Sequence, residues 1–121
     1  MKFLSRPISP SEIFGLNPKI RWTAFSTEEG RVTFSEMRPG VISYTSERDD
    51  RAFMEVGPHL MSGIAERLSS QGAGKVQSLI VNLEKDSVFL TQVGKGYLAI
   101  SADRTDAPAV FKEVEPMIRR L

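Results

Sequence analysis

The sequence predicts a single α+β domain in which helices cover both faces of a sheet. Five short segments show the two-residue periodicity of strands, and they come in groups of two and three separated by a helical pattern. The last three segments are apolar on both faces, which is typical of a sheet packed on both sides. With 121 residues, 40% hydrophobic and 26% charged, the chain has the size and composition of one domain. We place this domain at residues 9–121 and interpret residues 1–8 as an N-terminal arm.

The first predicted element is a short helix. Residues 9–12, Ser-Pro-Ser-Glu, predict a capping box with proline at the first helical position. Gly15 and the Asn17-Pro18 pair should end this helix after two turns at most.

A β-hairpin is predicted next, with strands over residues 20–26 and 31–37 and a turn at Gly30. Simple alternation predicts which side chains share a face: Ile20, Trp22 and Ala24 in the first strand, and Val32 and Phe34 in the second. Residues 41–50 are then expected to form a polar loop.

The middle helix is predicted over residues 50–70. Its apolar residues cover an arc of roughly 180°, wider than the ~100° needed to pack on one surface. The centre of this arc is formed by Phe53, Val56, Leu60, Ile64 and Leu68. Pro58 leaves two alternatives open, namely a helix kinked at the proline or a helix that begins near it.

Three strands and a final helix complete the predicted order. The strands are expected over residues 75–83, 87–93 and 97–102, and Val76 and Ile80 should share one face of the first. The last helix should be capped by Thr105 or Asp106, with Pro116 on its solvent side.

Composition excludes several kinds of site. The chain has no cysteine, which excludes disulfides, thiolate metal sites and cysteine nucleophiles. Its formal net charge of +1 gives no reason to expect nucleic acid or an anionic membrane as a partner. No apolar run has the length of a membrane helix, and the first residues lack the apolar stretch of a secretory signal. We therefore expect a cytoplasmic protein.

No catalytic motif is evident. His59 is the only histidine, so neither a catalytic triad nor a histidine metal site is expected, and we interpret it as a solvent-exposed residue. Residues 72–75, Gly-Ala-Gly-Lys, partly match a phosphate-binding loop. However, Ser69 and Val76 stand where the motif needs Gly and Ser or Thr, and the segment follows a helix instead of a strand. We interpret it as a helix end, and we expect no enzyme activity, no metal and no cofactor.

The charged residues likewise indicate no specific site. Glu47, Asp49 and Asp50 fall in the predicted loop, where acidic runs are usually solvated. Arg21 lies beside Trp22, but alternation places the two on opposite faces of a strand, which argues against a nucleic-acid surface. Trp22 itself is interpreted as a core residue.

Three stretches resemble the roadblock (dynein light chain type) domain, and the resemblance extends over about residues 9–121. They are Lys-Ile-Arg-Trp-Thr-Ala-Phe at 19–25 with Gly30, Gly-Lys-Val at 74–76, and Gly-Tyr-Leu-Ala-Ile-Ser at 96–101. The chain is most similar to small archaeal proteins of that superfamily. The resemblance implies a five-stranded antiparallel sheet of order 2-1-5-4-3, with the middle helix on one face and the terminal helices on the other.

The resemblance also implies a homodimer or heterodimer, in which third strands pair edge to edge and middle helices pack together. Dimers of the wider family act as scaffolds or regulators of small Ras-like GTPases, or as motor subunits. The interface residues that it implies here are Met61, Ile64, Ala65, Leu68, Val76, Leu79 and Val81. The short first helix, Pro58 and Pro116 depart from the family pattern.

Two other functions fit a related element order. A profilin-like or longin-like monomer is one, although Phe14 and Phe111, the aromatic residues of the terminal helices, are predicted to face the core. A small-ligand-sensing domain with a pocket between sheet and helix is the other. The absence of clustered polar groups in the sequence argues against this last function.

Overall fold

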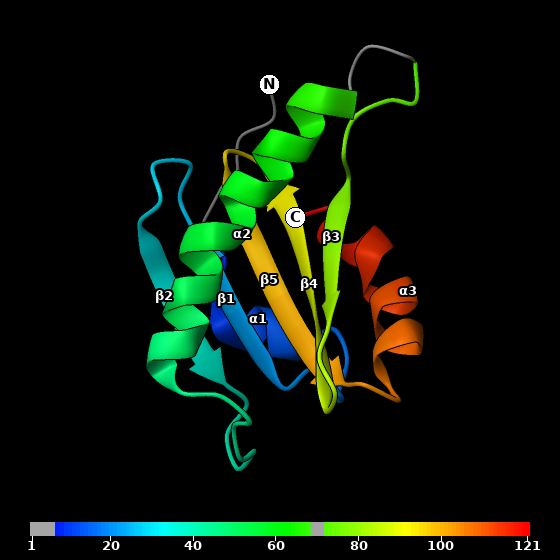
Figure 1. The fold of residues 1–121 in the computed structure, drawn as a ribbon. Coiled ribbons are helices and arrows are strands. Elements are labelled where there is room, and N and C mark those ends of the chain that lie inside the picture. Colours follow the sequence, from blue (N-terminus) through cyan, green and yellow to red (C-terminus); the bar gives the residue numbers. More distant parts are fainter. Residues whose placement is uncertain (1–6, 69–71) are drawn as a thin grey trace.

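Five antiparallel strands form one sheet in the order β2-β1-β5-β4-β3 in the computed structural model of the chain (Figure 1). The structure describes residues 7–68 and 72–121, so most of the predicted N-terminal arm and the last two residues of the predicted middle helix, 69 and 70, lie outside it. The elements are α1 Pro10–Phe14, β1 Trp22–Ser26, β2 Val32–Met37, α2 Glu47–Leu68, β3 Ser78–Asn82, β4 Asp86–Val93, β5 Gly96–Asp103 and α3 Ala107–Ile118. The predicted fold class, element order and strand order are confirmed.

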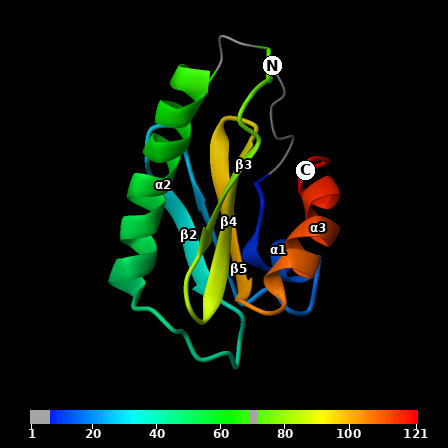
Figure 2. The same ribbon diagram turned by 45° about the vertical axis from the view of Figure 1, so that its right-hand side comes forward.

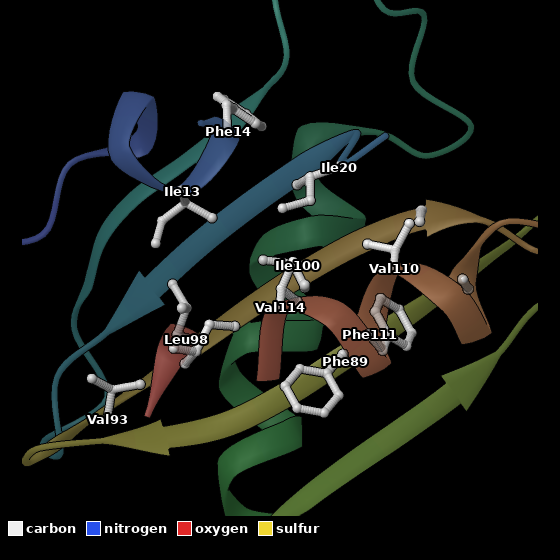
Figure 3. Close-up of a cluster of buried hydrophobic side chains, with 13 residues drawn as sticks. Ile13, Phe14, Ile20, Phe89, Val93, Leu98, Ile100, Val110, Phe111 and Val114 are labelled. Atoms are coloured by element: carbon white, nitrogen blue, oxygen red, sulfur yellow. The ribbon is translucent and has the colours of Figure 1, made fainter. Parts of the chain in front are cut away.

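Helices cover both faces of the sheet. Figure 2 shows α2 on one side and both α1 and α3 on the other. Each face has its own core, because successive side chains of a strand point to opposite faces. The core under α1 and α3 is drawn in Figure 3, where Phe89, Leu98 and Ile100 of the sheet meet Val110 and Val114 of α3. The core under α2 contains Trp22, Ala24, Met54, Met61, Val88, Leu90 and Ala99.

The first helix forms as predicted. The Ser9 hydroxyl accepts a hydrogen bond from the Glu12 amide at 3.3 Å, and the Glu12 carboxylate accepts one from the Ser9 amide at 3.4 Å. This reciprocal pair is the capping box. The helix is only five residues long, ends at Gly15, and buries Ile13 and Phe14.

The middle helix begins earlier than predicted. Ser46 and Asp49 exchange two backbone-to-side-chain hydrogen bonds of 3.1 Å, which start the helix at Glu47 within the segment predicted as a loop. The helix continues through Pro58, so a helix that begins near the proline is excluded. The prediction missed this start because the first turn is entirely charged and shows no apolar periodicity.

A β-bulge overturns the predicted faces of the hairpin. Phe25 pairs with Phe34, but Ser26 pairs with Val32, so Thr33 is an extra residue in β2. Val32 therefore packs toward α2 while Phe34 packs toward α1 and α3. The prediction that they share a face was wrong because alternation does not hold across a bulge.

Ile20 was also assigned to the wrong face. Its amide bonds to the Asn17 carbonyl in a turn, and β1 begins only at Trp22. Because the chain is not yet in the sheet at residue 20, Ile20 lies in the core under α1 and α3, opposite to Trp22 and Ala24.

The third strand is shorter than predicted, at five residues. Val76 precedes it and packs with Leu79 against the core under α2, while Ile80 points to the other face beside its partner Phe89. The predicted pairing of Val76 with Ile80 on one face was therefore wrong. In β4 and β5 the predicted faces are confirmed, as Val88 and Leu90 oppose Phe89 and Val93.

The last helix follows Asp106, whose side chain makes no capping hydrogen bond. The Asp106 carboxylate is instead 3.2 Å from the Lys19 ammonium group. Pro116 is exposed on the solvent side of α3, as predicted. The buried residues of this helix are Ala107, Val110, Phe111, Val114 and Ile118.

Candidate interaction surface

The outer side of α2 carries an apolar stripe. Val56, Leu60 and Leu68 are 64%, 48% and 58% exposed, and the half-buried Ile64 lies between the last two. Residues spaced by four lie on neighbouring turns of one helix face, so these four side chains form a continuous row. We call Val56, Leu60, Ile64 and Leu68 the α2 stripe.

The wide apolar arc predicted for the middle helix is divided into a part buried against the sheet and a part that stays exposed as the α2 stripe. Met54, Gly57 and Met61 are buried against the sheet and use one part of the arc. At Gly57 the helix approaches β4 so closely that an added Cβ would lie 2.8 Å from the Leu90 Cδ2 atom. The sheet contacts only this part of the arc, so the neighbouring part remains on the surface.

The β3 edge of the sheet is the second feature of this surface. Both β2 and β3 are edge strands. β2 carries the exposed Glu36 and is flanked by Arg31 and Arg38. Charged residues on an edge strand commonly prevent it from pairing with a strand of another chain. β3, with the sequence Ser-Leu-Ile-Val-Asn, has no charged residue, and its Ile80 is 49% exposed.

The structure brings only some of the predicted interface residues to the surface. Leu68 is exposed, and Ile64, Ala65 and Val81 are half-buried. Met61 is only 4% exposed and belongs to the core, while Val76 and Leu79 are half-buried and pack against it. Within α2 and β3, the exposed apolar residues that the prediction omitted are Val56, Leu60 and Ile80. Val56 and Leu60 already stood on the predicted apolar arc, so the helical wheel contained the signal.

Other candidate residues occupy the places that the sequence indicated. His59 is exposed on α2, and residues 72–75 lie between α2 and β3 and not between a strand and a helix. Trp22 is buried and packs edge-on against Phe53, with ring centroids 6.4 Å apart. Phe14 and Phe111 are buried in the core under α1 and α3.

Metal sites and membrane spans are absent from the part of the chain that the structure describes. No three acidic or histidine side chains within residues 7–68 and 72–121 are grouped so that they could hold a metal ion. None of the helices in these segments combines the length and hydropathy of a membrane span.

Three predictions about polar residues were wrong. Arg21 and Trp22 line the same pocket, because Arg21 precedes β1 and does not follow its alternation. Asp50 is half-buried, and burial raises the pKa of its carboxyl group. The sequence predicted that Asp50 would be solvated and that no polar groups would cluster between sheet and helix.

Comparison with solved structures identifies the fold. A Roadblock/LC7 domain from Streptomyces avermitilis matches with a TM-score of 0.63 and 19% identity, over 88% of this chain and 87% of that one. The chain has the roadblock fold. The gliding protein MglB from Thermus thermophilus, a second roadblock-fold protein, matches with a TM-score of 0.65 and 11% identity, over 91% of this chain and 82% of that one. A structure described as MglB with tetrameric arrangement matches over the same shares, with a TM-score of 0.66 and 11% identity.

At these identities the likeness extends to the roadblock fold and not to a shared activity. No protein-family model matches the sequence. No curated protein matches it either.

Proposed function

We propose that this protein is a non-catalytic interaction module that works as a dimer, joined through the β3 edge and the α2 stripe. The observation that carries the proposal is an exposed apolar helix row on the same domain as an uncharged edge strand that α2 contacts. A helix row of this kind is stabilised by burial against another apolar surface. A second copy offers such a surface by symmetry.

In a two-fold symmetric contact, both copies contribute the same two features, the β3 edge and the α2 stripe. In such a dimer, β3 of one copy would pair with β3 of the other, which satisfies the backbone groups of both edges. The α2 stripes would pack together on one face of the joined sheet. Burying one Val or Leu side chain fully contributes about 1.5–3 kcal/mol, so several half-exposed side chains from each copy supply a substantial apolar contribution.

Fold likeness supports oligomerisation as well. The similar MglB structure is described as having a tetrameric arrangement. Because only the fold is shared, this likeness supports the proposal without setting the number of copies.

The partner class that we propose for the dimer is a small Ras-like GTPase. The support is the roadblock fold itself, whose wider family includes scaffolds and regulators of such GTPases. Dimerisation through β3 and α2 would leave the outer faces of α1 and α3 free for the partner.

Light scattering coupled to size-exclusion chromatography tests the dimer. We expect twice the chain mass for the wild type, and a monomer for Leu60→Glu, because the new charge would be buried without a partner in the α2 stripe. Leu60 is 48% exposed in the single chain, so the variant should still fold. Ile42→Glu is the matched control, since Ile42 is 84% exposed but lies outside the α2 stripe, and it should remain a dimer.

A wild type that stays monomeric at its highest soluble concentration would contradict the dimer. The partner class needs a separate measurement. We expect a Ras-like GTPase from the same organism to bind the wild type with different affinities in its GTP-bound and GDP-bound forms. Equal or absent binding would contradict this part of the proposal and leave the dimer intact.

A further inference from the structure

A small pocket lies between the sheet and the N-terminal turns of α2. These turns form the lower end of that helix in Figure 1. The volume of the pocket is about 170 Å³. Trp22 of β1, Phe53 of α2 and Val88 of β4 provide apolar walls, and Tyr44 lies in the loop that precedes α2. Pockets for drug-sized ligands are usually about 300–1,000 Å³, so this one suits a small group and not a nucleotide.

The pocket is lined by more carboxylates than cations. Asp49, Asp50 and Asp86 face it, against the single cation Arg21. Asp86 is only 8% exposed, and its carboxylate receives no hydrogen bond or ion pair from the residues that the structure describes. Asp50 accepts one hydrogen bond, from the Thr45 hydroxyl. Buried carboxylates normally have a hydrogen-bond or ion-pair partner, and Asp86 has none among the described residues.

Arg21 is already engaged elsewhere. Its guanidinium group donates to the Ile42 carbonyl at 2.6 Å and lies 3.5 Å from the Asp103 carboxylate. It also stacks on the Tyr44 ring at 4.2 Å, and the Tyr44 hydroxyl donates to Asp103 at 2.9 Å. The Lys85 ammonium group is 5.7 Å from the centre of the same ring but does not line the pocket. These contacts hold both cations at Tyr44 and leave the Asp86 carboxylate available.

We infer that this pocket binds an ammonium or guanidinium group carried on a short apolar stem, with Asp86 and Asp50 as its counter-ions. The buried carboxylate of Asp86 supplies the charge, and the rings of Trp22 and Phe53 supply apolar contact and a favourable electrostatic field for a cation. Either a free small amine or the side chain of a lysine or arginine from another protein has this chemistry. The site is separate from the α2 stripe and does not depend on the proposed dimer.

Electrostatics supports the inference. Burial raises the pKa of Asp86, and the nearby positive charge of Arg21 lowers it by less. Burial likewise raises the pKa of Asp50, against the lowering effect of the Thr45 hydrogen bond. The ionised forms of both groups are therefore under-stabilised in this structure, and a bound cation would stabilise them.

Fluorescence offers a direct test, because Trp22 is the only tryptophan of the chain and lines the pocket. The full chain is titrated with n-butylammonium chloride, and binding is confirmed by calorimetry. We expect saturable binding in the millimolar range, since so small a ligand makes few contacts. n-Butanol, with the same stem and no charge, should bind about 10-fold more weakly or not at all.

Variants distinguish binding of the cation in this pocket from its nonspecific attraction to carboxylates elsewhere on the surface. Asp86→Asn should weaken n-butylammonium binding about 10-fold or more, because a charge-assisted contact is lost. Asp50→Asn is a second, independent variant, with a smaller expected loss. Glu28→Gln removes an exposed carboxylate from the hairpin turn and should leave binding unchanged. Binding should also weaken as the pH falls toward 3.8, the ordinary pKa of these groups.

Two sources of the ligand are distinguished by a parallel titration with an N-acetylated lysine amide. Tighter binding of the lysine amide indicates a protein side chain as the natural ligand, and tighter binding of n-butylammonium indicates a free amine. Absence of saturable binding to both ligands would overturn the inference. So would equal binding of n-butanol, or unchanged binding in both aspartate variants.

Discussion

Asp86 is a largely buried residue whose carboxylate faces the pocket between the sheet and α2. It stands at the first position of β4, directly after a turn. In the folded chain it is 8% exposed, and the pKa of its carboxyl group is raised mainly by burial. The nearby Arg21 offsets only part of this cost, because its guanidinium group is directed to Ile42, Asp103 and Tyr44.

This raised pKa determines how stability changes with pH. The folded chain binds a proton at Asp86 more readily than the unfolded chain does, so the ionised group opposes folding at neutral pH. That opposition disappears as the pH falls through the folded pKa toward the ordinary value of 3.8. We therefore expect Asp86→Asn to raise the free energy of unfolding at neutral pH.

Urea denaturation at a series of pH values measures this effect. The gain of Asp86→Asn over the wild type should shrink as the pH approaches 3.8. Glu28→Gln, an exposed carboxylate change, should shift stability by no more than about 0.5 kcal/mol. A variant less stable than the wild type at neutral pH would show that the ionised carboxylate stabilises the fold instead.

At the scale of elements, Arg38 connects the first helix to the hairpin. It follows β2, and its guanidinium group donates to the Ile20 carbonyl at 2.7 Å and to the Phe14 and Asn17 carbonyls at 2.8 Å each. It also lies 5.0 Å from the centre of the Phe14 ring. The five-residue helix α1 is too short to be stable by itself, so contacts of this kind hold it against the sheet.

Arg38→Lys tests the importance of this connection. Lysine keeps the charge but cannot reproduce the planar set of donors, so carbonyl groups near α1 lose their partners. We expect a loss of about 2 kcal/mol in the free energy of unfolding, measured by urea denaturation. Arg31→Lys, at an exposed position before β2, should change stability by less than about 0.5 kcal/mol. If both variants unfold at the same urea concentration, Arg38 contributes no more than a surface residue.

At the scale of the whole molecule, each face of the sheet has its own hydrophobic core, but the side of the domain formed by α2 and β3 keeps apolar residues on its surface. α1 and α3 cover one face of the sheet, and α2 crosses the other while contacting β1, β2 and β3 (Figures 1 and 2). Two features lack both a covering element and protecting charges, namely the α2 stripe and the uncharged β3 edge. In the proposed dimer both would be buried, so stability should depend on protein concentration.

We expect the thermal midpoint of the wild type to rise with concentration over about a hundredfold range, because mass action favours an associated folded state. Ile80→Lys should abolish this dependence by placing a charge on β3. Glu36→Lys places the same side chain on β2, the opposite edge strand, and should retain the dependence. A wild-type midpoint that is constant over this range in differential scanning calorimetry would contradict association through β3.

Much of the fold could be predicted from the sequence. The capping box of α1, the order of the elements and the faces of β4 and β5 all depend on residues a few positions apart. The strand order and the layers followed from the resemblance to the roadblock domain. Errors arose where a local rule was interrupted, at Ile20 before β1, at the bulge beside Val32, and at Val76 before β3.

The candidate sites were less predictable than the fold. The helical wheel indicated a face of α2 too wide for one contact, but not that Met61 would be buried and Val56 exposed. That division depends on the angle at which α2 crosses the sheet, and the close approach of Gly57 to Leu90 is part of that packing. A pocket between sheet and helix was an alternative that the sequence argued against, and its polar lining was not predicted, because Arg21, Asp50 and Asp86 are far apart in the sequence.

The sequence by itself determined the type and order of the elements and the absence of cysteine chemistry, because these follow from composition and short-range periodicity. Only the tertiary structure decided which part of the α2 arc stays exposed, that β3 is an uncharged edge, and that Asp86 is buried without a partner among the described residues. The physical reason is that burial depends on which segments meet across the sheet. These contacts depend on bulges, on the residue at which each strand begins and on the angle at which α2 crosses the sheet. The periodicity of a single segment contains no information about any of them.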